Sequence, residues 1–255
     1  KEIFIKLQEL KKTPEKNMNI FSKVGRNVHL TPTTKAKMIG ITGTNGKTTT
    51  TMLIYHILQK AGLKVGLAGN IGKSFAMQVA EQDFDYYVLE LSSFQLDDMY
   101  NFKCDIAILT NITPDHLDRY NYELKNYVMA KFRITQNQTA EDAFIYCADD
   151  ALTTEYLPSV EVKSKKYPFS IKTKIEEGAY LEDQQLIINT NNNQFTMLIH
   201  ELALQGKHNL YNSMAAGITS RLVDIRKEVI RESLSDFRNV EHRLEFVSTV
   251  HGIEF

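Results

Sequence analysis

The sequence predicts an α/β fold, built as an open and mostly parallel sheet flanked by helices. Residues 38–41 (MIGI), 86–89 (YYVL) and 106–109 (IAIL) are almost entirely apolar, which is typical of strands buried on both faces. Stretches with apolar residues at helical spacing lie between these runs, as in residues 48–61. Such alternation of strand and helix favours parallel neighbours joined by right-handed crossovers.

The other elements follow from the same signals in chain order. Gly62 stands just past the helix of residues 48–61, where a glycine C-cap is expected. Short apolar segments separated by Gly and Asn turns predict a small antiparallel β section near residues 165–200. The remaining predicted elements are helices over 2–12, 74–80, 208–222 and 226–236, one beginning near Asn121, and two short strands within 243–255.

Charge and cysteine content exclude several classes of protein. The 255 residues carry 30 Lys and Arg against 31 Asp and Glu, a net charge of -1, which argues against binding nucleic acid or an anionic membrane. No run approaches the roughly 20 apolar residues that a membrane-spanning helix needs. Only Cys104 and Cys147 are present, so a disulfide scaffold and a Cys-rich zinc site are excluded and a cytoplasmic setting is expected.

A loop with two glycines follows the first predicted strand. Residues 42–49 read TGTNGKTT and lead directly into a predicted helix. Backbone N–H groups of such a loop surround phosphate oxygens, and the helix N-terminus adds partial positive charge. Lys47 would neutralise phosphate charge and the Thr48 hydroxyl would bind Mg²⁺. The usual pattern has a further glycine where Ile41 stands, and the alternative is a glycine-rich turn with a solvated lysine.

Glu90 directly follows the second apolar run. Burying an unpaired carboxylate there would be costly, and a metal ion or another cation would offset that cost. The alternative is an ion pair with a nearby basic residue. The carboxyl ends of neighbouring parallel strands lie at one edge of a sheet, so Glu90 is expected beside the phosphate loop. That position favours a metal-binding role.

The third run leads into residues 110–119 (TNITPDHLDR). Thr113 is suited to an N-cap and Pro114 to the first position of a helix, which would hold Asp115 and His116 in the first turn, facing the same crevice. A lone histidine is commonly a packing residue. Its place after a third strand of one sheet favours a ligand role for His116.

Lys131 lies on the apolar side of the helix expected from residue 121, among Tyr127, Val128 and Ile134. A lysine there must extend to solvent, form an ion pair, or change its charge state. Periodicity alone favours extension to solvent. The other interpretation is a buried amine with a lowered pKa, which can react with CO₂ to give a metal-binding carbamate.

Taken together, these segments resemble the Mur ligase family. The similarity extends over residues 36–255, and residues 90–96 with 240–245 are most similar to the branch that adds D-glutamate. The segments that carry it are residues 43–49 (GTNGKTT), 69–72 (GNIG), 90–96 (ELSSFQL), 111–119 (NITPDHLDR), 206–212 (GKHNLYN) and 240–245 (VEHRLE).

The resemblance implies a P-loop-type ATPase domain in a cytoplasmic, monomeric ligase. Its substrates would be ATP, UDP-N-acetylmuramoyl-L-alanine and D-glutamate, joined through an acyl phosphate with Mg²⁺ as cofactor. Residues 36–240 would be the ATP-binding domain. Residues 1–35 would be a remnant of, or replacement for, a UDP-binding domain, and 241–255 the start of a linker or C-terminal domain.

The resemblance also implies roles for individual residues. The residues expected to bind ATP are Gly43, Thr44, Asn45, Gly46, Lys47, Thr48, Thr49, Asn209, Asn212 and Arg243. The expected metal ligands are Thr48, Glu90, His116 and a carbamylated Lys131. The expected catalytic residues are Lys47, Glu90, His116 and Lys131. The expected substrate-binding residues are Asn70, Ser92 and Asp115.

Two other functions are compatible with the phosphate loop. One is a related ligase, either a Mur ligase for a different amino acid or a folylpolyglutamate synthase, although the Ser-Ser-Phe-Gln segment after Glu90 is not expected there. The other is a nucleotide-binding module that switches a partner without catalysis. His116 and Lys131 would have no evident role in such a switch.

Overall fold

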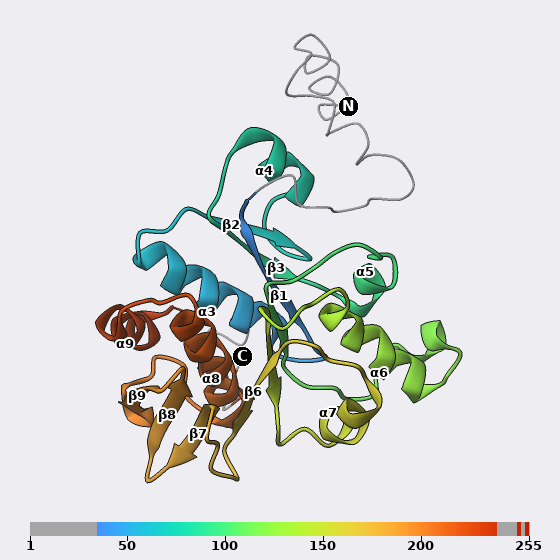
Figure 1. The fold of residues 1–255 in the computed structure, drawn as a ribbon. Coiled ribbons are helices and arrows are strands. Elements are labelled where there is room, and N and C mark those ends of the chain that lie inside the picture. The colour runs from blue at the N-terminus through green and yellow to red at the C-terminus, as the bar shows by residue number, and fades with distance from the viewer. Residues whose placement is uncertain (1–34, 239–248, 251–252, 255) are drawn as a thin grey trace.

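A nine-stranded mixed sheet organises residues 37–198. The computed structural model describes residues 35–238, 249–250 and 253–254, and the sheet order is β2-β3-β1-β4-β5-β6-β7-β8-β9 (Figure 1). Neighbours from β2 to β7 run parallel, whereas β7, β8 and β9 pair antiparallel. The strands are β1 (Lys37–Thr42), β2 (Val65–Gly69), β3 (Tyr86–Glu90), β4 (Ile106–Leu109), β5 (Ala143–Cys147), β6 (Lys165–Ser170), β7 (Gly178–Glu182), β8 (Gln185–Thr190) and β9 (Asn193–Leu198).

Helices cover both faces of the sheet. In Figure 1, α3, α8 and α9 lie on one side, and α5, α6 and α7 lie on the other. The α-helices are α3 (Lys47–Lys60), α4 (Phe75–Glu81), α5 (Ser93–Asp97), α6 (Leu124–Phe132), α7 (Ala151–Tyr156), α8 (Lys207–Leu222) and α9 (Lys227–Asp236). The 3₁₀ helices are Leu117–Tyr120, Arg133–Thr135, Leu157–Ser159 and Ile199–Glu201. The predicted α/β fold is therefore confirmed.

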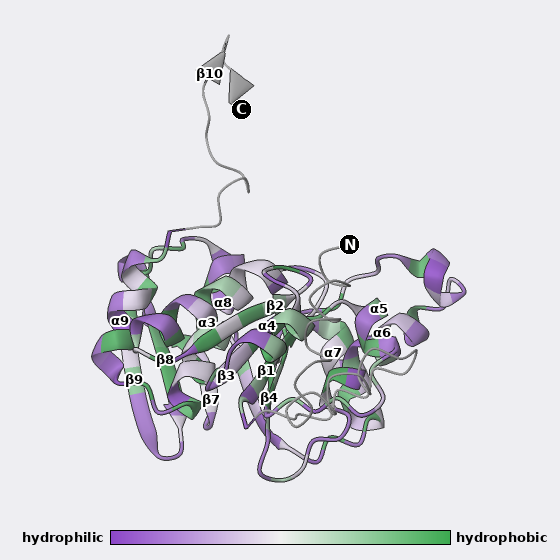
Figure 2. Cartoon of the chain, turned by 90° about the horizontal axis from the view of Figure 1, so that it is seen from above, coloured by the Kyte–Doolittle hydropathy of each residue, from purple (hydrophilic) through white to green (hydrophobic). Residues whose placement is uncertain are grey.

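Two hydrophobic cores fill the space between these layers. Along β1, Ile39 and Ile41 point into the core beneath α3 and α8, and Met38 points into the core beneath α6. Successive side chains of a strand point to opposite faces, so a strand covered on both sides reads as one continuous apolar run. Figure 2 shows hydrophobic residues concentrated toward the middle layer and hydrophilic residues on many outer turns.

The three strands predicted from apolar runs are present as β1, β3 and β4, and they are adjacent in the sheet. The antiparallel prediction for residues 165–200 is correct for β7 to β9 but wrong for β6, which pairs parallel with β5. Strands β7 to β9 are also part of the same sheet as β1 to β6 and do not form a separate one. Strand pairing depends on which distant segment lies alongside, so the local pattern did not reveal the direction of β6.

The predicted helix start at Thr113 and Pro114 is wrong. Residues 111–116 have no regular structure, and His116 has a left-handed backbone (φ 48°) before the 3₁₀ helix Leu117–Tyr120. The helix expected from Asn121 begins at Leu124, because Asn121 (φ 56°) and Tyr122 (φ 59°) also have left-handed backbones that an α-helix excludes.

Few of the predictions for the two ends of the chain can be compared with the structure. The predicted helix of residues 2–12 and Arg243 lie outside the described residues. The two short strands predicted within 243–255 are present as β10 (Thr249–Val250) and β11 (Ile253–Glu254), which form an antiparallel pair. Among the helices that the structure describes, none is long and apolar enough to cross a membrane.

Candidate active site

The candidate site lies where β3, β1 and β4 end. The strand register pairs Ile41 with Glu90 and Thr42 with Leu109, so the loop after β1 is flanked by Glu90 on one side and by the loop after β4 on the other. The carboxyl edge of an open parallel sheet is where such folds bind ligands. The sequence prediction that these three strand ends meet is confirmed.

The loop after β4 holds the glycine loop in place. Thr44 N donates to Asn111 O (2.9 Å) and Asn45 N donates to Asn111 Oδ1 (3.0 Å). In return, Asn45 O accepts from Thr110 Oγ1 (2.7 Å) and Asn111 Nδ2 (2.9 Å). A loop fixed in this way can present its remaining N–H groups without reorganising.

Thr44 joins the same loop to α6. Its Oγ1 lies 3.1 Å from Tyr127 Oη and accepts from Thr113 N (3.0 Å). Thr113 is thus engaged by the glycine loop, and the left-handed backbone of His116 (φ 48°) excludes the helix that Thr113 was expected to cap.

The two loop glycines cannot be replaced without strain. Gly43 (φ 148°) and Gly46 (φ 81°) have backbone conformations that side chains disfavour. A Cβ on Gly43 would overlap Thr110 Oγ1, and one on Gly46 would lie 2.5 Å from Asn212 Oδ1. The glycines therefore allow close packing of the loop against β4 and α8.

Two lysines converge on one carbonyl of the loop. Lys47 Nζ donates to Gly43 O (3.0 Å) and Thr44 O (2.8 Å), and Lys131 Nζ donates to Gly43 O (2.8 Å). Lys131 is only 2% exposed, so its side chain does not extend to solvent. Its ammonium also lies 4.5 Å from the centre of the Tyr127 ring. Of the two interpretations of Lys131, the structure therefore shows the buried amine and not the extension to solvent that periodicity favoured.

Burial, which is the largest cause, and the nearby charge of Lys47 together lower the pKa of Lys131 to about 7, whereas Asp115 opposes the shift. A charged amine is poorly solvated in such a place, so the neutral form gains relative stability. A neutral amine is nucleophilic, which is the chemical requirement for forming a carbamate.

Glu90 is buried with part of its carboxylate unsatisfied. It is 2% exposed, and Oε1 accepts from Asn70 Nδ2 (3.1 Å). Oε2 has no hydrogen-bond partner among the described residues. A buried carboxylate oxygen without a partner is costly, and a bound Mg²⁺ would satisfy it, since Mg²⁺ prefers oxygen ligands. The residues present therefore fit the metal that the sequence suggested.

Ser92 and Asn70 lie close to Glu90 but have structural partners of their own. Ser92 is the N-cap of α5, where its Oγ and Gln95 form a capping box. Asn70 N donates to Glu90 O (2.8 Å). The Ser-Ser-Phe-Gln segment thus fixes the chain where it leaves the end of β3.

Asp115 and His116 are exposed beside the site. His116 N donates to Asp115 Oδ1 (2.9 Å), and Nε2 lies 3.5 Å from Asp115 Oδ2. The imidazole packs edge-on against Phe94, with ring centres 5.4 Å apart, and Arg119 lies over the same ring. Within the described residues, no group of three or more His, Cys, Asp and Glu side chains is arranged around a metal position.

The other side of the loop faces the start of α8. Asn212 Oδ1 accepts from Thr50 Oγ1 (3.1 Å), and Asn212 Nδ2 donates to Asn209 Oδ1 (3.3 Å). A small hollow of about 60 Å³ lies here. It is lined by Asn45, Gly46, Thr110, Asn111, Phe169, His208, Tyr211 and Asn212.

Sequence reasoning missed several residues of this site. Asn111, Thr113 and Tyr127 hold the glycine loop, and Tyr211 lines the hollow. Asn111 and Thr113 lie within a segment already identified from the sequence. Tyr211 likewise lies within residues 206–212, a segment that the sequence analysis had identified.

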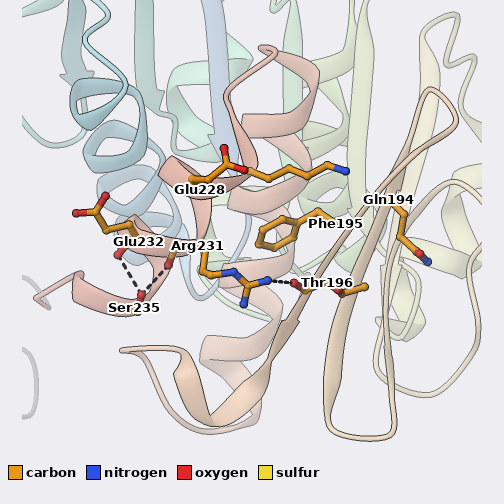
Figure 3. Close-up of a pocket in the computed structure, with 8 residues that line it drawn as sticks. Gln194, Phe195, Thr196, Glu228, Arg231, Glu232 and Ser235 are labelled. Carbon is orange, nitrogen blue, oxygen red and sulfur yellow. Dashed lines mark hydrogen bonds between the residues drawn. The ribbon is translucent and has the colours of Figure 1, made fainter.

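A wider hollow lies elsewhere. It measures about 510 Å³ between β9 and α9, and Figure 3 shows Phe195 and Arg231 within it. Arg231 is already engaged, because it pairs with Glu201 (2.7 Å) and donates to Thr196 O. None of the lining residues comes from the edge that carries the glycine loop.

Comparisons with known proteins agree with this arrangement. The sequence model of the Mur ligase middle domain matches residues 41–220. The chain is 62% identical over 225 residues to a UDP-N-acetylmuramoylalanine--D-glutamate ligase of Bacteroides fragilis, covering 87% of this chain and 50% of the relative. A protein of the same name from Bacteroides thetaiotaomicron is 60% identical over 222 residues, with the same coverage.

Solved structures share the fold at low identity. A UDP-N-acetylmuramoyl-L-alanyl-D-glutamate--2,6-diaminopimelate ligase has a TM-score of 0.68 at 21% identity, covering 85% of this chain and 49% of that one. A pseudomurein peptide ligase type C from Methanothermus fervidus has a TM-score of 0.67 at 21% identity, covering 95% and 61%. The chain spans about half the length of the curated relatives it matches. The match to the Mur ligase middle domain includes both the glycine loop and the start of α8. The chain therefore belongs to the Mur ligase family.

Proposed function

We propose that this chain is the ATP-binding part of an ADP-forming ligase that joins D-glutamate to UDP-N-acetylmuramoyl-L-alanine. In this reaction the substrate carboxylate attacks the γ-phosphate of ATP, ADP leaves, and the amine of D-glutamate displaces phosphate from the acyl phosphate. The names of the 62% and 60% identical relatives support the choice of substrates.

The observation that carries the proposal is the buried Lys131 on the Gly43 carbonyl. A phosphate loop that only binds and releases nucleotide does not require a second, buried amine beside its own lysine. A carbamate at Lys131 would turn that amine into an anionic ligand next to the phosphates. The alternative of a nucleotide-dependent switch gives Lys131 no role.

The remaining roles are those that the resemblance to the Mur ligases implies. Lys47 would neutralise phosphate charge, with Gly43, Thr44, Asn45, Gly46 and Thr49 surrounding the phosphates, and Asn209, Asn212 and Arg243 binding the rest of ATP. Thr48 and Glu90 would hold one Mg²⁺, and His116 with carbamylated Lys131 would hold a second. Asn70, Ser92 and Asp115 would contact the muramoyl-alanine part of the substrate.

When bound, Mg²⁺ reduces the repulsion between the attacking carboxylate and the triphosphate. The chain's own contribution is a loop that is already fixed by Asn111 and Thr113, so that phosphate binding costs little reorganisation. We further propose that the ligase acts as a cytoplasmic monomer. The free, buried thiols of Cys104 and Cys147 are consistent with a reducing compartment.

Amino-acid dependence of ADP release tests this function. The protein, at the full length of its curated relatives, is mixed with ATP, Mg²⁺ and UDP-N-acetylmuramoyl-L-alanine, and D-glutamate, L-glutamate or L-alanine is added. We expect sustained ADP release with D-glutamate only. ADP release that depends on another amino acid would indicate a related ligase. ADP release at the same rate with and without an amino acid would favour a nucleotide switch.

A further inference from the structure

A carboxylate at the end of β5 ties three separate segments together. Asp149 accepts hydrogen bonds from Ser170 Oγ (2.7 Å), Ile171 N (2.8 Å) and Tyr211 Oη (2.8 Å). Burial alone raises the pKa of Asp149, but these three donors outweigh it and hold the pKa below its ordinary value. Asp149 therefore remains an anion that binds α8 to the end of β6.

The Tyr211 end of this network reaches the candidate active site. Tyr211 lines the hollow beside the glycine loop, and its ring packs 6.0 Å from the centre of Phe169. The next residue of α8 is Asn212, which bonds to Thr50 and leaves no room for a Cβ on Gly46. A shift of Tyr211 would therefore move the Asn212 side chain relative to the glycine loop.

We propose that Asp149 is a positioning residue for the nucleotide, acting through Tyr211 to hold the first turns of α8 against the glycine loop. The inference rests on the proposed function, because that function identifies the nucleotide as Mg-ATP. Asp149 need not touch the ligand. Its effect comes from fixing a hydroxyl and a helix before the ligand arrives, which reduces the ordering needed on binding.

The opposite end of β5 supplies a matched control. Asp142 precedes the strand and is 5% exposed. It accepts from Lys103 Nζ (2.8 Å) and Thr139 N (2.6 Å), neither of which belongs to the site. Asp142 and Asp149 thus hold loops at the two ends of one strand, but only Asp149 is linked to the glycine loop.

The test compares Asp149→Asn, Tyr211→Phe and Asp142→Asn in the 255-residue chain. We expect the first two substitutions to weaken Mg-ATP binding by about fivefold, since each disturbs the charge-assisted hydrogen bond between Asp149 and Tyr211. Asp142→Asn should change the dissociation constant less than twofold even where it lowers Tm. Combining Asp149→Asn with Tyr211→Phe should add little, because both act through the same bond.

A readout without nucleotide separates this inference from the proposed function. Backbone hydrogen exchange across residues 207–212 should be faster in Asp149→Asn than in Asp142→Asn. Wild-type protein that fails to bind Mg-ATP would contradict the proposed function, and the exchange result would still decide whether Asp149 holds α8. Unchanged exchange in Asp149→Asn, or equal losses of affinity in Asp149→Asn and Asp142→Asn, would overturn the inference.

Discussion

Replacing Lys131 with alanine is expected to remove most of the ligase activity of the full-length protein, and replacing it with arginine should not restore that activity. With a pKa of about 7, roughly half of the Lys131 amines are uncharged at neutral pH and can react with CO₂. Arginine keeps its positive charge and cannot form the anionic ligand. Initial rates of D-glutamate-dependent ADP release measure the effect.

The same account predicts a carbamate signal from labelled bicarbonate in the 255-residue chain. The uncharged fraction grows as the pH rises through about 7, so the signal should be stronger at pH 8 than at pH 6. Lys60 is the matched control, because hydrogen bonds to Asp236 and Glu232 raise its pKa. The signal should persist in Lys60→Ala and vanish in Lys131→Ala. Full activity in Lys131→Ala or Lys131→Arg would refute a catalytic carbamate.

Replacing Gly46 with alanine should raise the dissociation constant of Mg-ATP at least tenfold. The left-handed backbone (φ 81°) would be strained by about 1 kcal/mol. The new methyl group would also lie 2.5 Å from Asn212 Oδ1 and push that side chain away from the loop. Both effects would disturb the loop that we propose to surround the phosphates, and calorimetric titration of the chain measures the loss.

Gly62→Ala separates the two effects. Gly62 has nearly the same backbone angle (φ 82°), but a Cβ there meets nothing within 4 Å. The Gly62→Ala variant should lose stability through backbone strain alone, and its dissociation constant for Mg-ATP should lie within about twofold of the wild-type value. Equal affinities for the Gly46→Ala and Gly62→Ala variants would show that the contact between the loop and α8 does not shape the nucleotide site.

The sequence predicted the parts of the fold whose signals are local. Continuous apolar runs identified β1, β3 and β4, because strands covered on both faces have no polar side. β2 was missed, since its short sequence contains Gly66 and Gly69, which weaken the strand pattern. The parallel direction of β6 is not evident from its own residues, because it depends on pairing with β5, for which the sequence predicts no strand.

The candidate site shows the same limit. Periodicity correctly placed Lys131 on a buried face, but its partner, the carbonyl of Gly43, lies 88 residues away in the sequence. Thr113 and Pro114 have a sound local signal for a helix start, yet Thr44 engages the Thr113 backbone and the backbone of His116 is left-handed, which excludes a helix there. Tertiary hydrogen bonds overrode a local preference of about 1 kcal/mol.

The central claim, that this chain serves a ligase working through an acyl phosphate, is tested most directly by isotope transfer. UDP-N-acetylmuramoyl-L-alanine labelled with heavy oxygen in its carboxylate is incubated with the full-length protein, ATP, Mg²⁺ and D-glutamate. The attacking carboxylate oxygen stays on phosphorus when the amine displaces phosphate. We therefore predict one heavy oxygen in each inorganic phosphate released. Phosphate that carries oxygen from water instead would show ATP hydrolysis without an acyl phosphate and contradict the account.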